Sequence, residues 1–248
     1  MLRALHPSLR KGPLELDREE SHHLVRVRRA GAGMPVALHD GAGAVGYGTL
    51  TTPDAKRARV EVERIETVPA PRHPLWLLQA LPKGKGMDGI VQRATELGVA
   101  RILPLLTAHG EVRLDAARAE HKTGKWRTLA DEAIKQCGNP WRPRIDLPRP
   151  FDGVLDEVAS VGAGLVAALR PPVRPVREAV KATIDAEAAR PLLVAVGPEG
   201  DFSPQEYDRL AAAGWQSVTL GPLVLRVETA SCALLALALD ALRETLES

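Results

Sequence analysis

The sequence predicts an α/β protein with a mainly parallel C-terminal sheet and a small β-rich N-terminal domain. From residue 75 onward, short apolar runs alternate with helical patterns, which is typical of a parallel sheet covered on both faces. Before residue 70, segments that alternate apolar and polar residues indicate half-exposed strands. Between these parts, three prolines in VPAPRHP (68–74) resist regular structure. The predicted domains are therefore 1–70 and 73–248.

The composition is typical of a globular protein that works in water. No apolar run approaches the roughly 18 residues that span a bilayer. The N-terminus has no long apolar stretch followed by a small-residue cleavage site, so we expect no signal peptide. With no sign of secretion, Cys137 and Cys232 are expected to be reduced thiols. We therefore expect a cytoplasmic protein with no membrane partner.

The N-terminal domain is predicted to contain one helix and a β-hairpin. Strands are predicted at 34–40, 44–50 and 58–66. GAG (41–43) joins the first two strands as a tight turn. GAGAVG also matches the dinucleotide-binding pattern, but that loop must open a helix and here it opens a strand, so we favour the turn. The helix is expected over 17–29, with Asp17 and Glu20 as a capping box.

The C-terminal domain is predicted to alternate strands with helices. The strands are expected at 75–81, 101–106, 164–170, 191–196 and 217–220. The helices are expected at 87–98 (with Asp88 as a possible cap), within 115–137, and at about 175–188, 204–213 and 228–246. Ser203, Pro204 and Glu206 form a complete helix start signal, and Gly214 ends that helix. The final helix is apolar nearly all round in its first half, which indicates burial between elements or subunits.

Positive charge is concentrated in the middle of the chain. Residues 71–150 hold 14 Lys and Arg against 8 Asp and Glu, whereas residues 151–248 hold 8 against 14. The middle part either faces a polyanion or is a solvated mixture of charges. Lys83 and Lys85 lie on a glycine-containing loop before a helix, which suits either a phosphate contact or a solvated loop.

Helical spacing brings Arg26 and Arg29 near His22, where they either meet a phosphate backbone or form a solvated face. The adjacent His22 and His23 point to different sides of a helix and cannot form a two-ligand metal site alone. We predict no metal site.

Two Gly-Pro loops follow predicted strands. VGPEG (196–200) and LGPLVLR (220–226) expose backbone N–H and C=O groups with few side chains in the way. Ligands of parallel sheets bind outside the carboxyl ends of the strands. The two loops therefore predict a pocket for a planar, hydrogen-bonding ligand such as adenine or a ribose.

Four segments carry a family resemblance: LQALPKGKGMDGIVQRATELGVARILPLL, HKTGKWRTLADEAIKQC, VGPEGDFSPQE and LGPLVLRVETA. Together they resemble the ribosomal small-subunit RNA uridine N3-methyltransferase family, which belongs to the trefoil-knotted class. The resemblance covers nearly the whole chain. It implies a knot in the C-terminal sheet and a PUA-like RNA-binding N-terminal domain. The chain departs from the family at Asp201, usually glycine, and at Leu223 and Asn139, each usually arginine.

The resemblance implies S-adenosylmethionine as cofactor and uracil N3 as the methyl acceptor. Implied cofactor contacts are Leu169, Val196, Gly197, Glu199, Gly200, Leu220, Gly221, Pro222 and Leu225. Arg226 would stabilise negative charge on the uracil oxygens. Glu199 or Glu228 would accept the proton, although Glu228 also suits the free N–H groups of a helix N-terminus.

Ribosomal RNA of the small subunit is the implied partner. The expected phosphate contacts are His22, Arg26, Arg29, Lys83, Lys85, Arg93 and Lys135. The apolar final helix, together with the resemblance, implies a homodimer. Two alternatives stay open: a knotted methyltransferase acting on a ribose 2′-hydroxyl or another base, and a non-catalytic assembly factor that binds ribosomal RNA.

Overall fold

The computed structural model describes residues 1–112, 114–162, 164–169, 171–184 and 188–247. The chain divides into two units, which are described separately. The first comprises Met1–Ala70 and Asp131–Arg142, and the second comprises Pro71–Ala130 and Pro143–Ser248. The segment Asp131–Arg142 therefore belongs with the N-terminal residues, although the sequence pattern placed it in the C-terminal domain.

A five-stranded mixed sheet, ordered β1-β3-β4-β5-β2, forms the first unit. Its strands are β1 (Leu2–Leu5), β2 (Gly12–Glu15), β3 (Pro35–His39), β4 (Ala44–Thr52) and β5 (Arg59–Thr67). The predicted hairpin is confirmed, because β3 and β4 pair antiparallel with His39 opposite Val45. Within GAGAVG, residues 41–43 thus form the turn and residues 44–46 begin β4. Leu24, Leu38 and Leu50 are fully buried in the core of this unit.

The predicted N-terminal helix forms in two parts. The α-helix α1 (Arg18–His22) continues as the π-helix η1 (His23–Val27). Asp17 caps it, since its Oδ1 accepts a 2.8 Å hydrogen bond from the N–H of Glu20. The carboxylate of Glu20 accepts instead from the N–H of Leu5 and from Lys135. The second half of the predicted capping box is therefore replaced by tertiary contacts.

The second unit contains a parallel sheet ordered β11-β13-β10-β12-β6-β7-β8, with β9 paired to β7. Every pairing in it is parallel, which confirms the predicted mainly parallel sheet. The strands are β6 (Leu75–Ala80), β7 (Arg101–Leu106), β8 (Arg144–Ile145), β9 (Arg149–Pro150), β10 (Gly164–Ala167), β11 (Arg174–Pro175), β12 (Leu192–Val196) and β13 (Gln216–Thr219).

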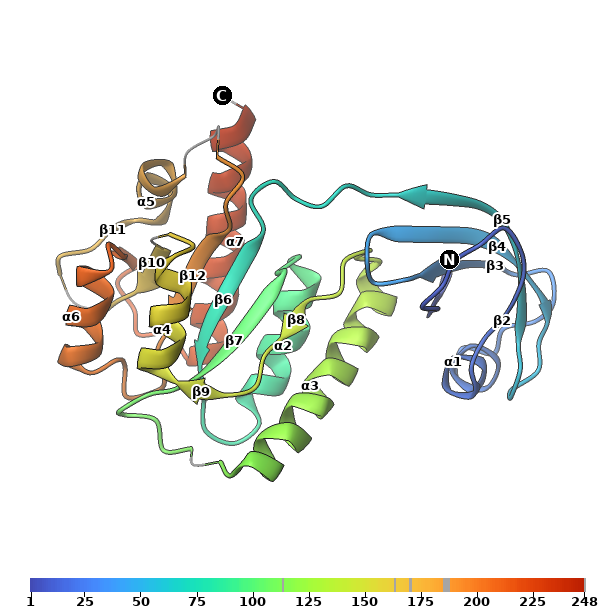
Figure 1. The fold of residues 1–248 in the computed structure, drawn as a ribbon, viewed down its shortest axis with the longest axis horizontal. Helices are drawn as coiled ribbons and strands as arrows, with labels where there is room; N and C mark the ends of the chain where they lie inside the picture. Colours follow the sequence, from blue (N-terminus) through green and yellow to red (C-terminus); the bar gives the residue numbers. More distant parts are fainter. Residues whose placement is uncertain (113, 163, 170, 185–187, 248) are drawn as a thin grey trace. The chain divides into compact units, whose positions relative to one another are not determined.

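Helices cover both faces of this sheet (Figure 1). One face carries α2 (Gly86–Glu96), α3 (Ala116–Cys137), α5 (Val176–Thr183) and α7 (Val227–Glu247), and the other carries α4 (Phe151–Ala159) and α6 (Pro204–Ala212). Neighbouring residues of a strand face opposite layers. Leu77 packs in the core beneath α2 and α7, whereas Leu78 packs in the core beneath α4 and α6. Burial on both faces explains why the strands appear as continuous apolar runs.

The helix boundaries show which local sequence signals correctly predict where a helix begins. Ser203 and Glu206 form the predicted capping box at the start of α6. Asp88 lies in the first turn of α2 and not at its cap, and it accepts from Trp126 Nε1 at 3.2 Å. The sequence reasoning missed α4, the edge strands β1 and β2, and the two-residue strands β8, β9 and β11. Arg170 and residues 185–187, which fell within predicted segments, lie outside the described residues.

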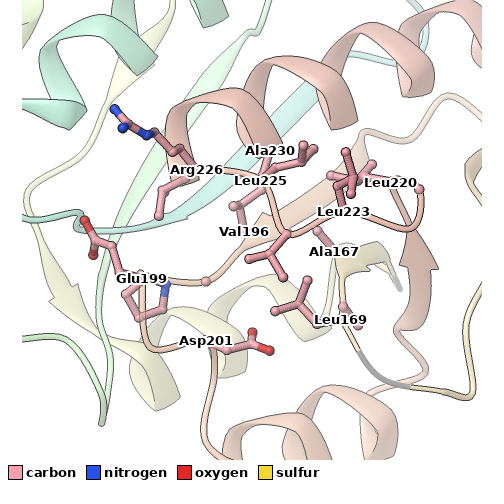
Figure 2. A pocket seen from close by; sticks show the side chains of 16 residues that line it. Ala167, Leu169, Val196, Glu199, Asp201, Leu220, Leu223, Leu225, Arg226 and Ala230 are labelled. Carbon is pink, nitrogen blue, oxygen red and sulfur yellow. The ribbon is translucent and has the colours of Figure 1, made fainter.

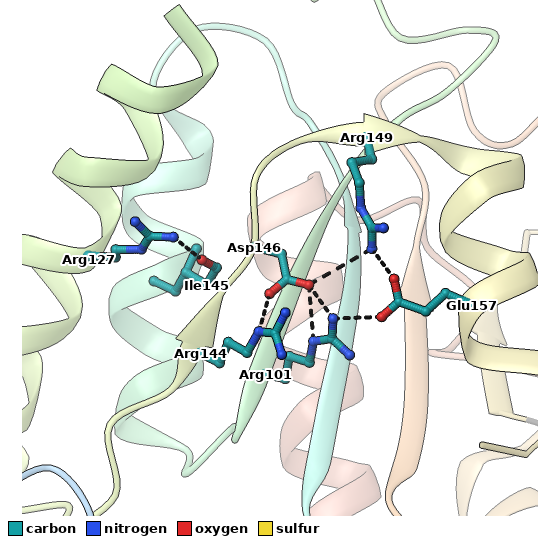
Figure 3. Close-up of polar contacts among 7 residues, drawn as sticks. All are labelled: Arg101, Arg127, Arg144, Ile145, Asp146, Arg149 and Glu157. Atoms are coloured by element: carbon teal, nitrogen blue, oxygen red, sulfur yellow. Dashed lines mark hydrogen bonds and ion pairs between the residues drawn. The ribbon is translucent and has the colours of Figure 1, made fainter. Parts of the chain in front are cut away.

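A buried ion network lies where β7 begins (Figure 3). The side chain of Arg101 is 10% exposed and contacts both Asp146 and Glu157. Its Nε donates to Asp146 Oδ2 at 3.1 Å, and its guanidinium lies 4.8 Å from the ring centre of Trp76. Asp146 also accepts from Arg144 at 2.7 Å. Three elements, β7, β8 and α4, are tied together by this cluster. Among the described helices, none is long and apolar enough to cross a bilayer.

Candidate functional site

Three loops at the carboxyl ends of neighbouring parallel strands enclose a pocket (Figure 2). They follow β10, β12 and β13, which lie side by side in the sheet. The pocket encloses about 170 Å³. The two predicted Gly-Pro loops do lie together, and the residues after β10 complete the enclosure.

Most of the residues expected to contact the cofactor line this pocket. Seven of the nine do so: Leu169, Val196, Gly197, Glu199, Leu220, Gly221 and Leu225. Gly200 and Pro222 belong to the same loops but are not part of the lining. Gly200 faces His109 instead, since a Cβ on it would lie 3.2 Å from His109 Cβ.

The pocket wall is mainly apolar. Val196 is buried at its base, while Leu223 and Val224 are 73% and 78% exposed at its edge. Gly197 lets the chain approach closely, because a Cβ there would lie 3.1 Å from both Asp201 Oδ1 and Phe202 N. An apolar wall with few polar groups is the usual environment of an aromatic ligand such as adenine.

Among the residues that the structure describes, three charged side chains line the pocket: Glu199, Asp201 and Arg226. Figure 2 shows Glu199 and Arg226 on the same side, away from Leu169. Glu199 Oε1 accepts a 2.9 Å hydrogen bond from the N–H of Lys83. Within the described chain, the exposed guanidinium of Arg226 has neither a hydrogen bond nor an ion pair. This side of the pocket therefore offers a free cation beside a positioned carboxylate.

Glu228, the other predicted proton acceptor, lies outside the pocket lining. Its Oε1 is 2.7 Å from where a Cβ on Gly86 would be, so it sits against the first residue of α2. It also lies in the first turn of its own helix, α7. A carboxylate near the N-terminus of a helix stabilises that helix, so Glu228 can stabilise both α2 and α7.

Asp201 is a lining residue that the predicted contacts did not include. Its φ is +60°, and its Oδ1 accepts from Phe202 N and from the Tyr207 hydroxyl, both at 2.8 Å. The departure from the family's usual glycine was the signal in the sequence that marked this position. His109 holds the same loop, with its Nδ1 3.0 Å from Gly200 O.

Two of the predicted phosphate contacts of the first unit share a groove. His22 and Arg26 line it with Arg18 and Lys56. Arg29 is exposed, with a φ of +55° that ends the helix. The groove therefore presents mostly basic side chains, as the helical spacing predicted for His22 and Arg26.

The predicted phosphate contacts of the second unit are exposed. Lys83, Lys85 and Arg93 all lie on the surface. The Lys83 ammonium lies 2.7 Å from Glu111, and this hydrogen bond raises the pKa of Lys83. Arg93 donates to Gly89 O at 3.2 Å.

Lys135 requires a correction. Its side chain is 5% exposed, and its Nζ lies 2.8 Å from Glu20 and 2.7 Å from Glu132. Burial and two carboxylate partners leave this ammonium unable to reach a phosphate, so the prediction for Lys135 was wrong. Helical periodicity places Lys135 on α3 but does not show that Glu20, distant in sequence, covers it.

Metal-ligating side chains do not gather anywhere in the described chain: no group of three His, Cys, Asp or Glu residues there could hold an ion. The two cysteines are both free.

Known proteins resemble this chain over most of its length. A family described as "RNA methyltransferase domain" matches residues 69–239. "Ribosomal RNA small subunit methyltransferase E" of Mycobacterium bovis is 32% identical over 87% of this chain and 82% of its own. The protein of the same name from Bacillus subtilis is 28% identical over 86% and 84%. A crystal structure of the Neisseria gonorrhoeae protein of that name, bound to S-adenosyl methionine, superimposes with a TM-score of 0.82 at 27% identity, covering 95% of each chain.

Proposed function

The chain belongs to the RNA methyltransferase domain family, and from this premise we propose that it methylates N3 of a uridine in small-subunit ribosomal RNA. It is an S-adenosylmethionine-dependent methyltransferase of that RNA. The uridine and its N3 atom are our proposal. The observation that supports them best is the free Arg226 beside the positioned Glu199 at the pocket.

The pocket residues fit the cofactor. Val196, Leu220 and Leu225 would flank the adenine, while backbone groups of Gly197 and of its loop neighbours would meet adenine and ribose. Leu169 closes the pocket from the β10 loop. We propose Gly200, Gly221 and Pro222 as residues that shape the two Gly-Pro loops. When bound, S-adenosylmethionine supplies a methyl group on a positively charged sulfur.

Methylation of uracil N3 requires that the N3–H bond break, and the chain must stabilise the charge that results. Loss of the proton places negative charge on the two uracil oxygens, which the guanidinium of Arg226 is free to neutralise. Glu199 would receive the proton, since its carboxylate is held at the pocket by Lys83 N–H. The new N3–carbon bond forms as the methyl–sulfur bond breaks. Holding N3 in line with the methyl group supplies much of the acceleration.

Of the two candidate bases, Glu199 is the better placed. It lines the pocket, on the same side as Arg226 (Figure 2). Glu228 lies against Gly86, at the start of α2. We therefore assign proton transfer to Glu199, and to Glu228 the stabilisation of the loop and helix that adjoin the pocket.

We propose that the second unit is trefoil-knotted and that the first is PUA-like, with domains at 1–70 and 73–248 apart from Asp131–Arg142, which belongs to the first unit. The sheet order supports the knot: after β12 the chain crosses β10 to form β13, and α7 then packs on β6 and β12. A homodimer is also proposed. Apolar side chains of Leu223, Val224 and Leu237 remain exposed around the pocket and on α7, and a second copy would cover them.

Ribosomal RNA would bind through basic side chains. His22, Arg26 and Arg29 on the first unit and Lys83, Lys85 and Arg93 on the second are the proposed phosphate contacts. We also place the protein in the cytoplasm, where its two free cysteines would stay reduced.

Transfer of labelled methyl groups tests this function. The protein is incubated with methyl-labelled S-adenosylmethionine and either naked small-subunit RNA or assembled subunits. Label in the RNA is expected. Cofactor binding without any transfer to either substrate would favour a non-catalytic assembly factor.

A further inference from the structure

Asp201 lines the pocket in a backbone conformation that few side chains adopt. Its φ of +60° lies in the left-handed region, which aspartate and asparagine tolerate better than most residues. Its N–H donates to Pro198 O at 2.9 Å, closing a turn. Glycine would adopt this turn easily but would bring no carboxylate. The aspartate therefore adds a charged group to the pocket without changing the course of the chain.

One oxygen of this carboxylate is held by two donors. Oδ1 accepts from Phe202 N and from the Tyr207 hydroxyl, each at 2.8 Å. The hydroxyl is 3.3 Å from Ala167 O, so its single proton is directed to the nearer carboxylate. Burial, and then the hydrogen bond to Asp201, raises the pKa of Tyr207, which keeps the phenol protonated. The carboxylate is thereby fixed in orientation.

The second oxygen, Oδ2, has no donor in the part of the chain that the structure describes. Asp201 is half-buried and lies beside Leu169, on the side of the pocket away from Arg226 (Figure 2). In an apolar pocket, a few placed polar groups determine the orientation and identity of the ligand. An oriented oxygen that no described residue donates to is such a group.

We propose that Asp201 is a specificity-determining residue that presents Oδ2 to a donor or positive group of the bound cofactor. The inference rests on the proposed function, because it takes S-adenosylmethionine as the ligand. That molecule offers the adenine amino group, the ribose hydroxyls and the ammonium as hydrogen-bond donors, and the sulfonium as a positive charge. This chain thus recognises its cofactor with a side-chain carboxylate as well as with backbone groups.

Asparagine at this position isolates the role of Oδ2. Two donors, Phe202 N–H and Tyr207 O–H, require an oxygen opposite them, so the asparagine Oδ1 stays in place. Its Nδ2 then replaces Oδ2, which removes both the charge and the acceptor. Asparagine also tolerates a positive φ. Asp208→Asn is the matched control, because Asp208 is exposed on α6 and does not line the pocket.

Calorimetric titration of the full chain with S-adenosylmethionine tests the proposal. Asp201→Asn should weaken binding about tenfold or more, with Asp208→Asn unchanged. Asp201→Gly, which keeps the turn, should weaken binding as well and serves if the asparagine variant does not fold. Thermal unfolding without ligand should change little for Asp201→Asn, because both Oδ1 contacts remain. Equal affinity of folded Asp201→Asn and the unmodified protein would overturn the role of Asp201.

A second ligand, S-adenosylhomocysteine, identifies the group of the cofactor that Oδ2 contacts. A loss of affinity for S-adenosylmethionine but not for S-adenosylhomocysteine, which lacks the sulfonium charge, assigns it to that charge. An equal loss for both assigns it to an amine or hydroxyl. Either pattern supports the proposal. If the unmodified protein itself binds neither ligand, the proposed function fails, which is a separate outcome from equal binding by Asp201→Asn.

Discussion

The backbone N–H of Lys83 donates a 2.9 Å hydrogen bond to Oε1 of Glu199, which joins the β6–α2 loop to the loop after β12. These residues are 116 positions apart in the sequence. The contact needs no charge on the carboxylate, because the oxygen of a glutamine amide would also accept it. Positioning and proton transfer can therefore be separated at Glu199.

Glu199→Gln should keep the loop contact and lose the proton acceptor. We expect kcat to fall about 100-fold or more, with little change in affinity for S-adenosylmethionine. Steady-state methyl transfer and calorimetry measure the two effects. Glu228→Gln is the control and should retain most activity. If Glu199→Gln were active and Glu228→Gln were not, the assignment of the base would be reversed.

Arg226→Ala should abolish most methyl transfer while leaving the cofactor bound. The guanidinium has neither a hydrogen bond nor an ion pair in the described chain, so its removal breaks no such interaction there and should not unfold the protein. Loss of one group that stabilises developing charge costs about 100-fold or more in kcat. Single-turnover methylation at saturating cofactor is the measurement. Turnover near that of the unmodified protein would remove Arg226 from the mechanism.

Arg26→Ala should weaken the binding of RNA whatever the RNA sequence, and the affinity should depend less on salt concentration. Loss of one phosphate contact should reduce the slope of log affinity against log salt by about one. Arg64→Ala removes the same charge from β5, outside the groove, and is the matched control. Filter binding across a salt series measures both. Identical slopes for Arg26→Ala and the unmodified protein would exclude the groove as a phosphate site.

Asp146→Asn should destabilise the second unit without touching the pocket. It removes the charge from the main partner of buried Arg101, while Glu157 remains (Figure 3). Breaking such a pair costs about 3 kcal/mol of unfolding free energy. Arg144→Gln removes an exposed partner of the same carboxylate and should cost under about 1 kcal/mol. Urea unfolding compares the two. If both variants lost the same unfolding free energy, burial of Arg101 would not make its ion pair with Asp146 more important for stability.

Local signals in the sequence predicted most elements of the fold. Apolar runs located β6, β7, β12 and β13, and the Ser203–Glu206 box located α6. The short strands β8, β9 and β11 have two residues each, too few to show a periodicity. In α4, Val154, Leu155 and Val158 do have helical spacing, so that signal was present but overlooked.

The part of the pocket that is formed by backbone loops could be predicted from the sequence. Two Gly-Pro loops at strand ends indicated the site, and both line it. Contacts between distant residues were not predictable from one sequence. Lys135 was expected to contact phosphate, but its ammonium is bound by Glu20, 115 positions away in the sequence. The hydrogen bond between Tyr207 and Asp201 likewise depends on the left-handed backbone turn at Asp201. A residue other than glycine gives no signal in the sequence that such a turn is present.

Identification of the methylated nucleoside tests the proposed activity most directly. Small-subunit ribosomal RNA is incubated with S-adenosylmethionine and the protein, digested to nucleosides and analysed by mass spectrometry. We predict N3-methyluridine with the unmodified protein and at least about 100-fold less with Arg226→Ala in the same time. Methylation of a ribose 2′-hydroxyl, of another base, or of nothing at all would contradict the proposed reaction.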